Sequence, residues 1–230
     1  MSIYEKIRML HNIYIKNNFF IKKKTYSMNG EDIFVNNFFK KKSGFYVDVG
    51  AYHPLELNNT YLLYKKKWNG INIDINLISI DYFNFLRPDD LNINVGVSNK
   101  NSTKTLYYQK SKSPLNTLNF KQAKKIFLNR FKKKKIKTRT LTNIIDNTKY
   151  NGKKIDFLNI DAEGNDFEVL KSLNFNKYKP KLICIELIDH LNPNKKIIKR
   201  HKIYKYLSKR NYKLVWSGHF SHIFRYSNFK

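Results

Sequence analysis

The sequence contains little cysteine, proline or glycine and no long hydrophobic run. Its one cysteine, Cys184, excludes an internal disulfide and is typical of a reducing compartment. Five prolines and eight glycines stand among 230 residues, and no Gly/Ser-rich linker divides the chain. No window holds the ~20 apolar residues that a membrane-spanning helix needs, and the start lacks the apolar core of a signal peptide. We therefore expect a cytoplasmic globular protein.

Acidic residues are also scarce. The chain contains 17 Asp and Glu and 45 Lys and Arg, which gives a formal net charge of +28 at pH 7. Such a charge suggests a polyanionic partner, but 38 of the cations are lysine and only seven are arginine, the side chain that binds phosphate bidentately. Lysine is encoded by A/T-rich codons. We interpret most of the charge as codon bias and solvated lysine, and keep a polyanionic partner as the alternative.

Hydrophobic residues make up 41% of the chain and aromatic residues 15%, enough to fill a core. In residues 1–24, Ile3, Ile7, Leu10 and Tyr14 recur at helical spacing and predict a basic amphipathic helix. We expect residues 1–42 to form a helical extension that packs on the core. The alternative is a helix at an anionic membrane surface, which would place the protein at the inner face of the membrane.

Residues 43–230 alternate between strand and helix patterns, which predicts an α/β domain with a mostly parallel sheet and helices on both faces. The expected strands are 45–49, 71–75, 91–97, 136–141, 155–161 and 181–187, followed by an antiparallel pair at 212–216 and 221–226. The expected helices are 59–67, 77–86, 142–146, 165–173 and 197–210.

A less regular stretch, 99–135, is expected to be an insertion or a mobile lid. It has room for a hairpin at 103–109 and a helix around 120–131. We interpret its final lysine run, 132–135, as a solvated loop or helix end, with a clamp for an anionic acceptor as the alternative.

The first expected strand leads into the loop DVGAYHP, residues 48–54. Ligands bind outside the carboxyl ends of the strands in open α/β sheets, and a glycine there lets a cofactor approach the backbone. Only Gly50 is present, whereas a dinucleotide fold requires G-x-G-x-x-G. The loop therefore permits a nucleoside cofactor without phosphate, such as S-adenosylmethionine. The alternative is an ordinary strand-to-helix turn.

Further acids stand at expected strand ends. Asp74 ends the second strand, where a carboxylate can accept bonds from both hydroxyls of a ribose. Asp161 and Glu163 follow a later strand, where two carboxylates can orient or deprotonate a substrate hydroxyl. The alternative is that these acids cap helices.

The chain resembles the FkbM-type S-adenosylmethionine-dependent methyltransferases from about residue 26 to residue 225. The resemblance rests on YSMNGED (26–32), GFYVDVGAYHP (44–54), NNTYLLYKKKWNGINID (58–74), RPDDLNINVGVSN (87–99), SPLNTL (113–118), KTRTLTNIID (137–146), IDFLNIDAEGNDFEVLKSL (155–173), KPKLICIE (179–186) and RNYKLVW (210–216). It implies a class I Rossmann-like fold: a seven-stranded, mostly parallel sheet with an antiparallel C-terminal hairpin. Members typically methylate hydroxyls of sugars or similar small molecules.

The resemblance also implies roles for individual residues. Residues expected to bind the cofactor are Asp48, Gly50, Ala51, Asn59, Thr60, Asp74, Ile75, Val97, Ser98 and Asp161. Within this set, Asp74 would hold the ribose, and Ile75, Val97 and Ser98 would border the adenine. Glu31 and Asp32 stand where the family has G-E-D, whereas Met28 replaces a residue that is usually polar.

Transfer needs a base that takes the proton of the acceptor hydroxyl. Glu163 is the first candidate, Asp161 the second and His190 the third. A Mg²⁺-dependent variant that uses Asp161 and Glu163 is a less favoured alternative. The expected acceptor is a sugar or glycan, with anionic or lipid-linked forms included. A nucleic-acid methyltransferase and a non-catalytic basic binding protein are the alternative functions, and no specific nucleic acid is expected.

Overall fold

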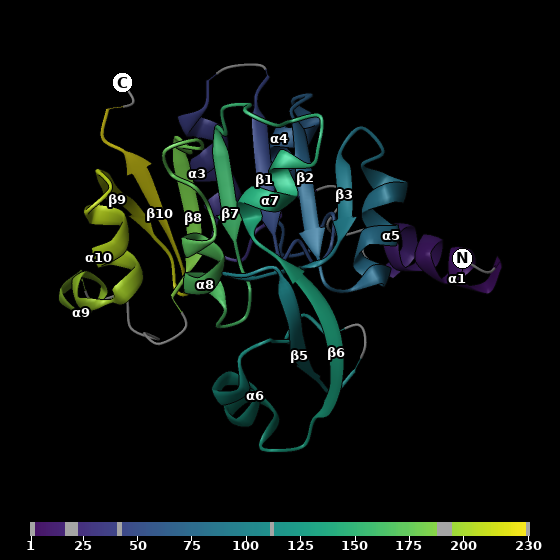
Figure 1. Ribbon diagram of the computed structural model, residues 1–230. Helices are drawn as coiled ribbons and strands as arrows, with labels where there is room; N and C mark the ends of the chain where they lie inside the picture. Colours follow the sequence, from purple (N-terminus) through teal and green to yellow (C-terminus); the bar gives the residue numbers. More distant parts are fainter. Residues whose placement is uncertain (1–2, 17–22, 41–42, 111–112, 188–194, 229–230) are drawn as a thin grey trace.

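The computed structural model describes residues 3–16, 23–40, 43–110, 113–187 and 195–228. They form a mixed α/β fold around a seven-stranded sheet with the order β3-β2-β1-β7-β8-β10-β9 (Figure 1). The strands are β1 (Phe45–Val49), β2 (Asn69–Asp74), β3 (Leu91–Asn94), β7 (Phe157–Ile160), β8 (Leu182–Glu186), β9 (Tyr212–Ser217) and β10 (Ser221–Tyr226). The first five in spatial order run parallel, and β10 runs antiparallel to β8 and β9. The predicted mixed α/β architecture with a mostly parallel sheet is confirmed.

Both faces of the central strands are covered. All five residues of β1 are buried, and their side chains alternate between the two faces because successive residues of a strand point in opposite directions. Phe45, Val47 and Val49 join one hydrophobic cluster, whereas Tyr46 joins another on the opposite face. A continuous apolar run of this kind is typical of a parallel strand between two layers of helices.

The first cluster includes residues of α7 (Leu141–Asp146), α8 (Asp166–Lys171) and α10 (Lys202–Ser208), and the second includes residues of α3 (Glu31–Phe38) and α4 (Tyr61–Lys65). Helix α5 (Leu77–Leu86) has the bounds expected from the sequence. The helix expected at 197–210 is divided into α9 (Lys195–Arg200) and α10. It breaks because His201 is extended and its side chain accepts a bond from the Ile203 amide, which caps α10.

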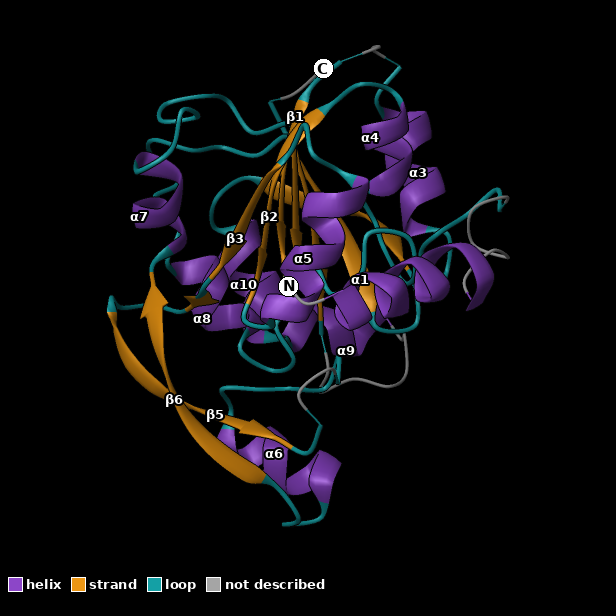
Figure 2. Ribbon diagram, turned by 90° about the vertical axis from the view of Figure 1, so that its right-hand side faces the viewer, coloured by secondary structure: helices purple, strands orange, loops and turns teal. Residues whose placement is uncertain are grey.

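A second, three-stranded sheet has the order β4-β6-β5, with β4 (Gly96–Val97), β5 (Ser102–Tyr108) and β6 (Lys132–Arg139). The expected strand 91–97 is therefore divided, since its last residues pair with β6 instead of β2. The interpretation of Lys132–Lys135 as a loop or helix end is wrong, because these residues pair with β5. Nor does 103–109 form a hairpin of its own. The β5–β6 pair projects from the carboxyl edge of the large sheet and carries α6 (Phe120–Phe127), as Figures 1 and 2 show.

The N-terminal segment consists of α1 (Ile3–Leu10) and η1 (His11–Lys16), a short π-helix. It contacts the core through Met9 and Ile13, which pack with Tyr26, Leu55 and Tyr82. Residues Ile3, Ile7, Leu10 and Tyr14, which were expected to form the packed face, are exposed. Within the described ranges, no helix combines the length and the hydrophobicity that a membrane crossing requires.

Candidate active site

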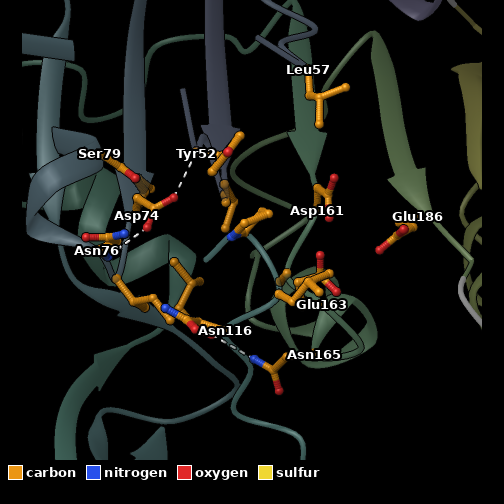
Figure 3. Close-up of a pocket in the computed structure, with 18 of the residues that line it drawn as sticks. Tyr52, Leu57, Asp74, Asn76, Ser79, Asn116, Asp161, Glu163, Asn165 and Glu186 are labelled. Carbon is orange, nitrogen blue, oxygen red and sulfur yellow. Dashed lines mark hydrogen bonds between the residues drawn. The ribbon is translucent and has the colours of Figure 1, made fainter. Parts of the chain in front are cut away.

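A cavity lies at the carboxyl edge of the large sheet, where β1, β2, β7 and β8 end (Figure 3). Gly50, Asp74, Asp161 and Glu186 come from the ends of these four strands and line it together. Parallel strands deliver their carboxyl ends to one edge, so residues far apart in the sequence meet there. Residues 113–116 and Leu118 line another wall, so the insertion takes part in the site.

The cavity is acidic although the chain is strongly basic. Among the described residues that line it, five are acids and none is Lys, Arg or His: Glu31, Asp74, Asp161, Glu163 and Glu186. The chain has 45 Lys and Arg against 17 acids, so a random sample of its surface would be dominated by cations. Clefts lined by one sign of charge concentrate ligands of the opposite sign. This lining therefore favours a cationic ligand over an anionic one.

Gly50 connects the loop after β1 to the turn after β7. Its φ of 76° lies in the left-handed region, and a Cβ at this position would overlap the backbone oxygen of Asp161. The amides of Gly50 and Ala51 both donate to the Ile73 carbonyl, at 2.9 and 3.2 Å. The loop after β1 is thus held against strand β2 and against the turn after β7, and only glycine fits at its contact with that turn.

Asp74 lies on the opposite side of the cavity, at the end of β2 (Figure 3). Its Oδ2 accepts a bond from the Tyr52 amide at 2.8 Å, and its Oδ1 accepts one from the Asn76 amide at 2.7 Å. Burial raises the pKa of Asp74 to about 6, and the two amide bonds oppose this shift. A carboxylate oxygen can accept two hydrogen bonds, so each oxygen of Asp74 can accept one more bond from a ligand in the cavity.

Asp161 and Glu163 occupy the turn between β7 and α8, and both line the cavity. The turn is tight, with a φ of 49° at Glu163 and 84° at Gly164. The Asp166 carboxylate braces it by accepting bonds from the amides of Ala162 at 2.7 Å and Gly164 at 3.0 Å. Burial raises the pKa of Glu163, and the negative charges of Asp161 and Asp166 raise it further. Glu163 is therefore a stronger base than an exposed glutamate.

Glu186, at the end of β8, belongs to the site but was not predicted. One oxygen each of Asp161, Asp166 and Glu186 lies within 4.8 Å of the other two. Burial raises the pKa of Glu186, and the Asp161 charge adds to the shift. Burial raises the pKa of Asp161 to about 7, and the hydrogen bond between the two carboxyls opposes this shift but raises the pKa of Glu186 further, so the proton they share resides on Glu186. The sequence signal was available, since the strand before Glu186 lies beside β7 and ends at the same edge.

Glu163 is not part of this carboxylate group. Both oxygens of Asp166 already accept backbone amides, which occupies part of the capacity that a metal ion would use. The described residues therefore give no support to Mg²⁺ held by Asp161 and Glu163.

Comparison with protein-family models gives one match, the methyltransferase FkbM domain, over residues 48–214. This match covers well over half of the chain. The chain belongs to the FkbM methyltransferase family. Comparisons with curated proteins and with solved structures gave no significant match.

In this FkbM methyltransferase, two of the residues expected to contact the cofactor lie behind the cavity wall. Asp48 accepts bonds from Asn159 Nδ2 at 2.8 Å and Thr60 Oγ1 at 2.9 Å, and Arg87 Nη1 donates to that same hydroxyl at 2.8 Å. Asp48 and Thr60 are both buried and do not line the cavity. They brace the loop after β1 from within. Asn59 does line the cavity, and its Nδ2 donates to Asn159 Oδ1 at 2.9 Å.

The remaining residues expected to bind the cofactor also fall into two groups, those that line the cavity and those that are buried behind its wall. Ile75 and Val97 line the cavity of the FkbM methyltransferase beside Asp74. Ala51 and Ser98 are buried outside the lining, and Lys104 Nζ donates to Ser98 Oγ at 2.6 Å.

Of the G-E-D segment, Glu31 lines the cavity, whereas Asp32 is turned inward and accepts bonds from Thr25, Ser27 and the Tyr26 amide. Met28 lines the cavity in place of the usual polar residue and keeps 57% of its surface exposed. His190, the third candidate base, lies outside the described residues.

Proposed function

We propose that this FkbM methyltransferase uses S-adenosylmethionine to methylate a hydroxyl of a sugar, a glycan or a similar small molecule, on a class I Rossmann-like sheet. The acidic cavity carries this proposal. S-adenosylmethionine bears a sulfonium and an ammonium, and five carboxyl groups suit that charge in a cavity whose described lining contains no Lys, Arg or His.

The residues present fit the parts of this cofactor. Asp74 has acceptor capacity for the two ribose hydroxyls. Ile75 and Val97 supply apolar surface for the flat base on the same side of the cavity. Asp161 lies across from them, where its negative charge would attract the sulfonium, and the protonated Glu186 lies beside it (Figure 3). When bound, the cofactor supplies an electrophilic methyl group.

The protein's own part in the transfer is to position the acceptor and to remove its proton. A hydroxyl oxygen that forms a bond to carbon gains positive charge, so its proton becomes acidic during the transfer. Glu163 faces the cavity, and burial beside Asp161 and Asp166 raises the pKa of its carboxyl. A base whose pKa lies close to the working pH accepts a proton effectively. We assign the base role to Glu163, whereas Asp161 is engaged with Glu186.

Isothermal titration calorimetry with S-adenosylmethionine tests this proposal. We expect saturable binding at one site, followed by methyl transfer to a member of a panel of neutral and phosphorylated sugars. Asp89→Asn is the matched control, because Asp89 is an exposed acid outside the cavity. It should bind the cofactor as the parent does. A correctly folded protein that shows no binding at millimolar cofactor would refute the proposal.

A further inference from the structure

The positive charge is concentrated in one part of the chain. Residues 91–145 contain no Asp or Glu and 14 Lys or Arg, which is half of the net charge in about a quarter of the length. The other 175 residues carry 31 cations and all 17 acids. Codon bias raises lysine throughout a chain but does not remove every acid from one segment. This segment therefore requires an explanation of its own.

Thirteen of the 14 cations of this segment lie between residues 102 and 139. We call the described elements of that range, β5, α6 and β6, the basic hairpin. Lys132, Lys133, Lys134 and Lys135 occupy consecutive positions in β6, and all four are exposed. Lys121, Lys124 and Lys125 are exposed on α6. The ion pairs of the described residues involve Lys171, Lys177 and Lys181, none of which belongs to the hairpin.

The basic hairpin is joined directly to the turn that carries Glu163. Lys133 pairs with Tyr107, and Tyr107 exchanges two backbone hydrogen bonds with Thr117, at 2.9 and 3.1 Å. Thr117 Oγ1 donates to the Glu163 carbonyl at 2.6 Å. Neighbouring strands lie ~4.8 Å apart, so the backbone of Lys133 is roughly 10 Å from Thr117.

A second bond fixes the same junction. Asn119 Nδ2, at the start of α6, donates to the Gly164 carbonyl at 2.9 Å. These two bonds fix the position of the basic hairpin, and therefore of its lysines, relative to Glu163, the candidate base. The charge arrangement then limits where each part of an acceptor can lie. The cavity contains five acids and repels an anion, whereas the hairpin beside it attracts one.

We propose that the basic hairpin binds the phosphate of the methyl acceptor, and that the acceptor is a glycosyl phosphate or pyrophosphate. The sugar hydroxyl then reaches Glu163 while the phosphate stays outside the cavity on the lysines. Lysine binds phosphate as a mobile point charge, which suits an exposed strand better than a rigid bidentate site. This inference rests on the function proposed above and specifies its substrate class.

Titration of inorganic pyrophosphate into the full-length protein tests the phosphate site without any need for turnover. We compare the parent with Lys133→Gln/Lys135→Gln, which removes two exposed hairpin charges. The control is Lys205→Gln/Lys209→Gln, which removes two exposed charges at α10. We expect Kd for pyrophosphate to rise about tenfold in the hairpin variant and less than about twofold in the control. Equal effects in the two variants, or no binding by the parent, would overturn the proposal.

Two further measurements separate this inference from the proposed function. S-adenosylmethionine should bind all three proteins equally, since no lysine lines the cavity among the described residues. Failure of cofactor binding would refute the function, whereas failure of pyrophosphate binding alone would refute the phosphate site. The same proteins are also mixed with a single-stranded RNA oligonucleotide or with phosphatidylglycerol vesicles. Pyrophosphate should displace either one if it binds the basic hairpin at micromolar concentration. Hairpin-dependent binding of either one that pyrophosphate does not displace would overturn the proposal in favour of a nucleic acid or a membrane.

Discussion

Asp74 shows how one side chain can support a loop and still serve a ligand. Both of its oxygens hold backbone amides, which orients the carboxylate toward the cavity before any cofactor arrives. Such preorganisation lowers the entropic cost of binding. The ribose would then meet an acceptor that is already in place.

Asp74→Asn should weaken S-adenosylmethionine binding about tenfold, because one of the two carboxylate acceptors becomes a donor and the charge is lost. A tenfold change corresponds to about 1.4 kcal/mol, within the range of a hydrogen bond to a charged group. Calorimetry measures the change, with Asp89→Asn as the control of equal charge. Unchanged affinity would remove Asp74 from the ribose site.

Glu163→Gln should lower kcat by about 10²–10⁴-fold, the usual contribution of a general base, while Kd for the cofactor changes little. In the parent, kcat should fall as the pH is lowered through the raised pKa of Glu163, because the protonated carboxyl cannot accept a proton. The glutamine variant should lack this acidic limb. Glu168→Gln, at an acid on the surface of α8, serves as the control. A parent-like rate in Glu163→Gln would exclude the base role.

Among the elements, the ends of β7 and β8 bring together three carboxyls that an isolated turn would keep apart. Burial raises the pKa values of Asp161, Asp166 and Glu186. Each of these carboxyls has a higher pKa in the folded protein than in the unfolded chain. At any pH between the two pKa values, the folded state therefore binds more protons than the unfolded state. This difference makes stability decrease as the pH rises through that window.

Glu186→Gln should flatten this dependence, because glutamine keeps a donor for Asp161 and carries no charge. The free energy of unfolding of the parent should fall from pH 5 to pH 8, and that of the variant should fall less. Urea unfolding at several pH values measures both slopes. A parent whose stability rises over this interval would contradict the raised pKa values. Glu168→Gln should retain the parental slope.

The sequence predicts the elements that have a clear period and misses those that lack one. Helix α5 and strand β1 appear where expected, because their apolar patterns are continuous. The second half of β6 lies where a strand was expected at 136–141, whereas its first half was missed because Lys132–Lys135 show no apolar alternation. The pairing of these lysines with β5 depends on residues 24 to 30 positions away. In the site, strand-end position identified Asp74, Asp161 and Glu163 as candidates. It could not show that Asp48 turns inward or that Glu186 completes the carboxyl group.

At the scale of the whole molecule, the net positive charge destabilises the compact folded state. A net charge of +28 on one chain produces repulsion that salt screens. Tm should therefore rise by several °C between ~20 and ~300 mM NaCl, as differential scanning calorimetry can measure. Lys133→Gln/Lys135→Gln should show a smaller rise, because it removes charge from the densest cluster. A Tm that falls over this range would show that attractive ion pairs outweigh the repulsion.

The contact between Gly50 and the Asp161 backbone has a consequence for protein engineering. The loop after β1 and the turn after β7 fit together without room for a Cβ, so they must be inherited as a matched pair. The basic hairpin meets that pair through backbone carbonyls at Glu163 and Gly164, which any sequence supplies. A chimera that exchanges residues 102–139 should therefore fold, although it replaces the cavity wall formed by residues 113–116 and Leu118. A chimera divided between residues 50 and 161 should not.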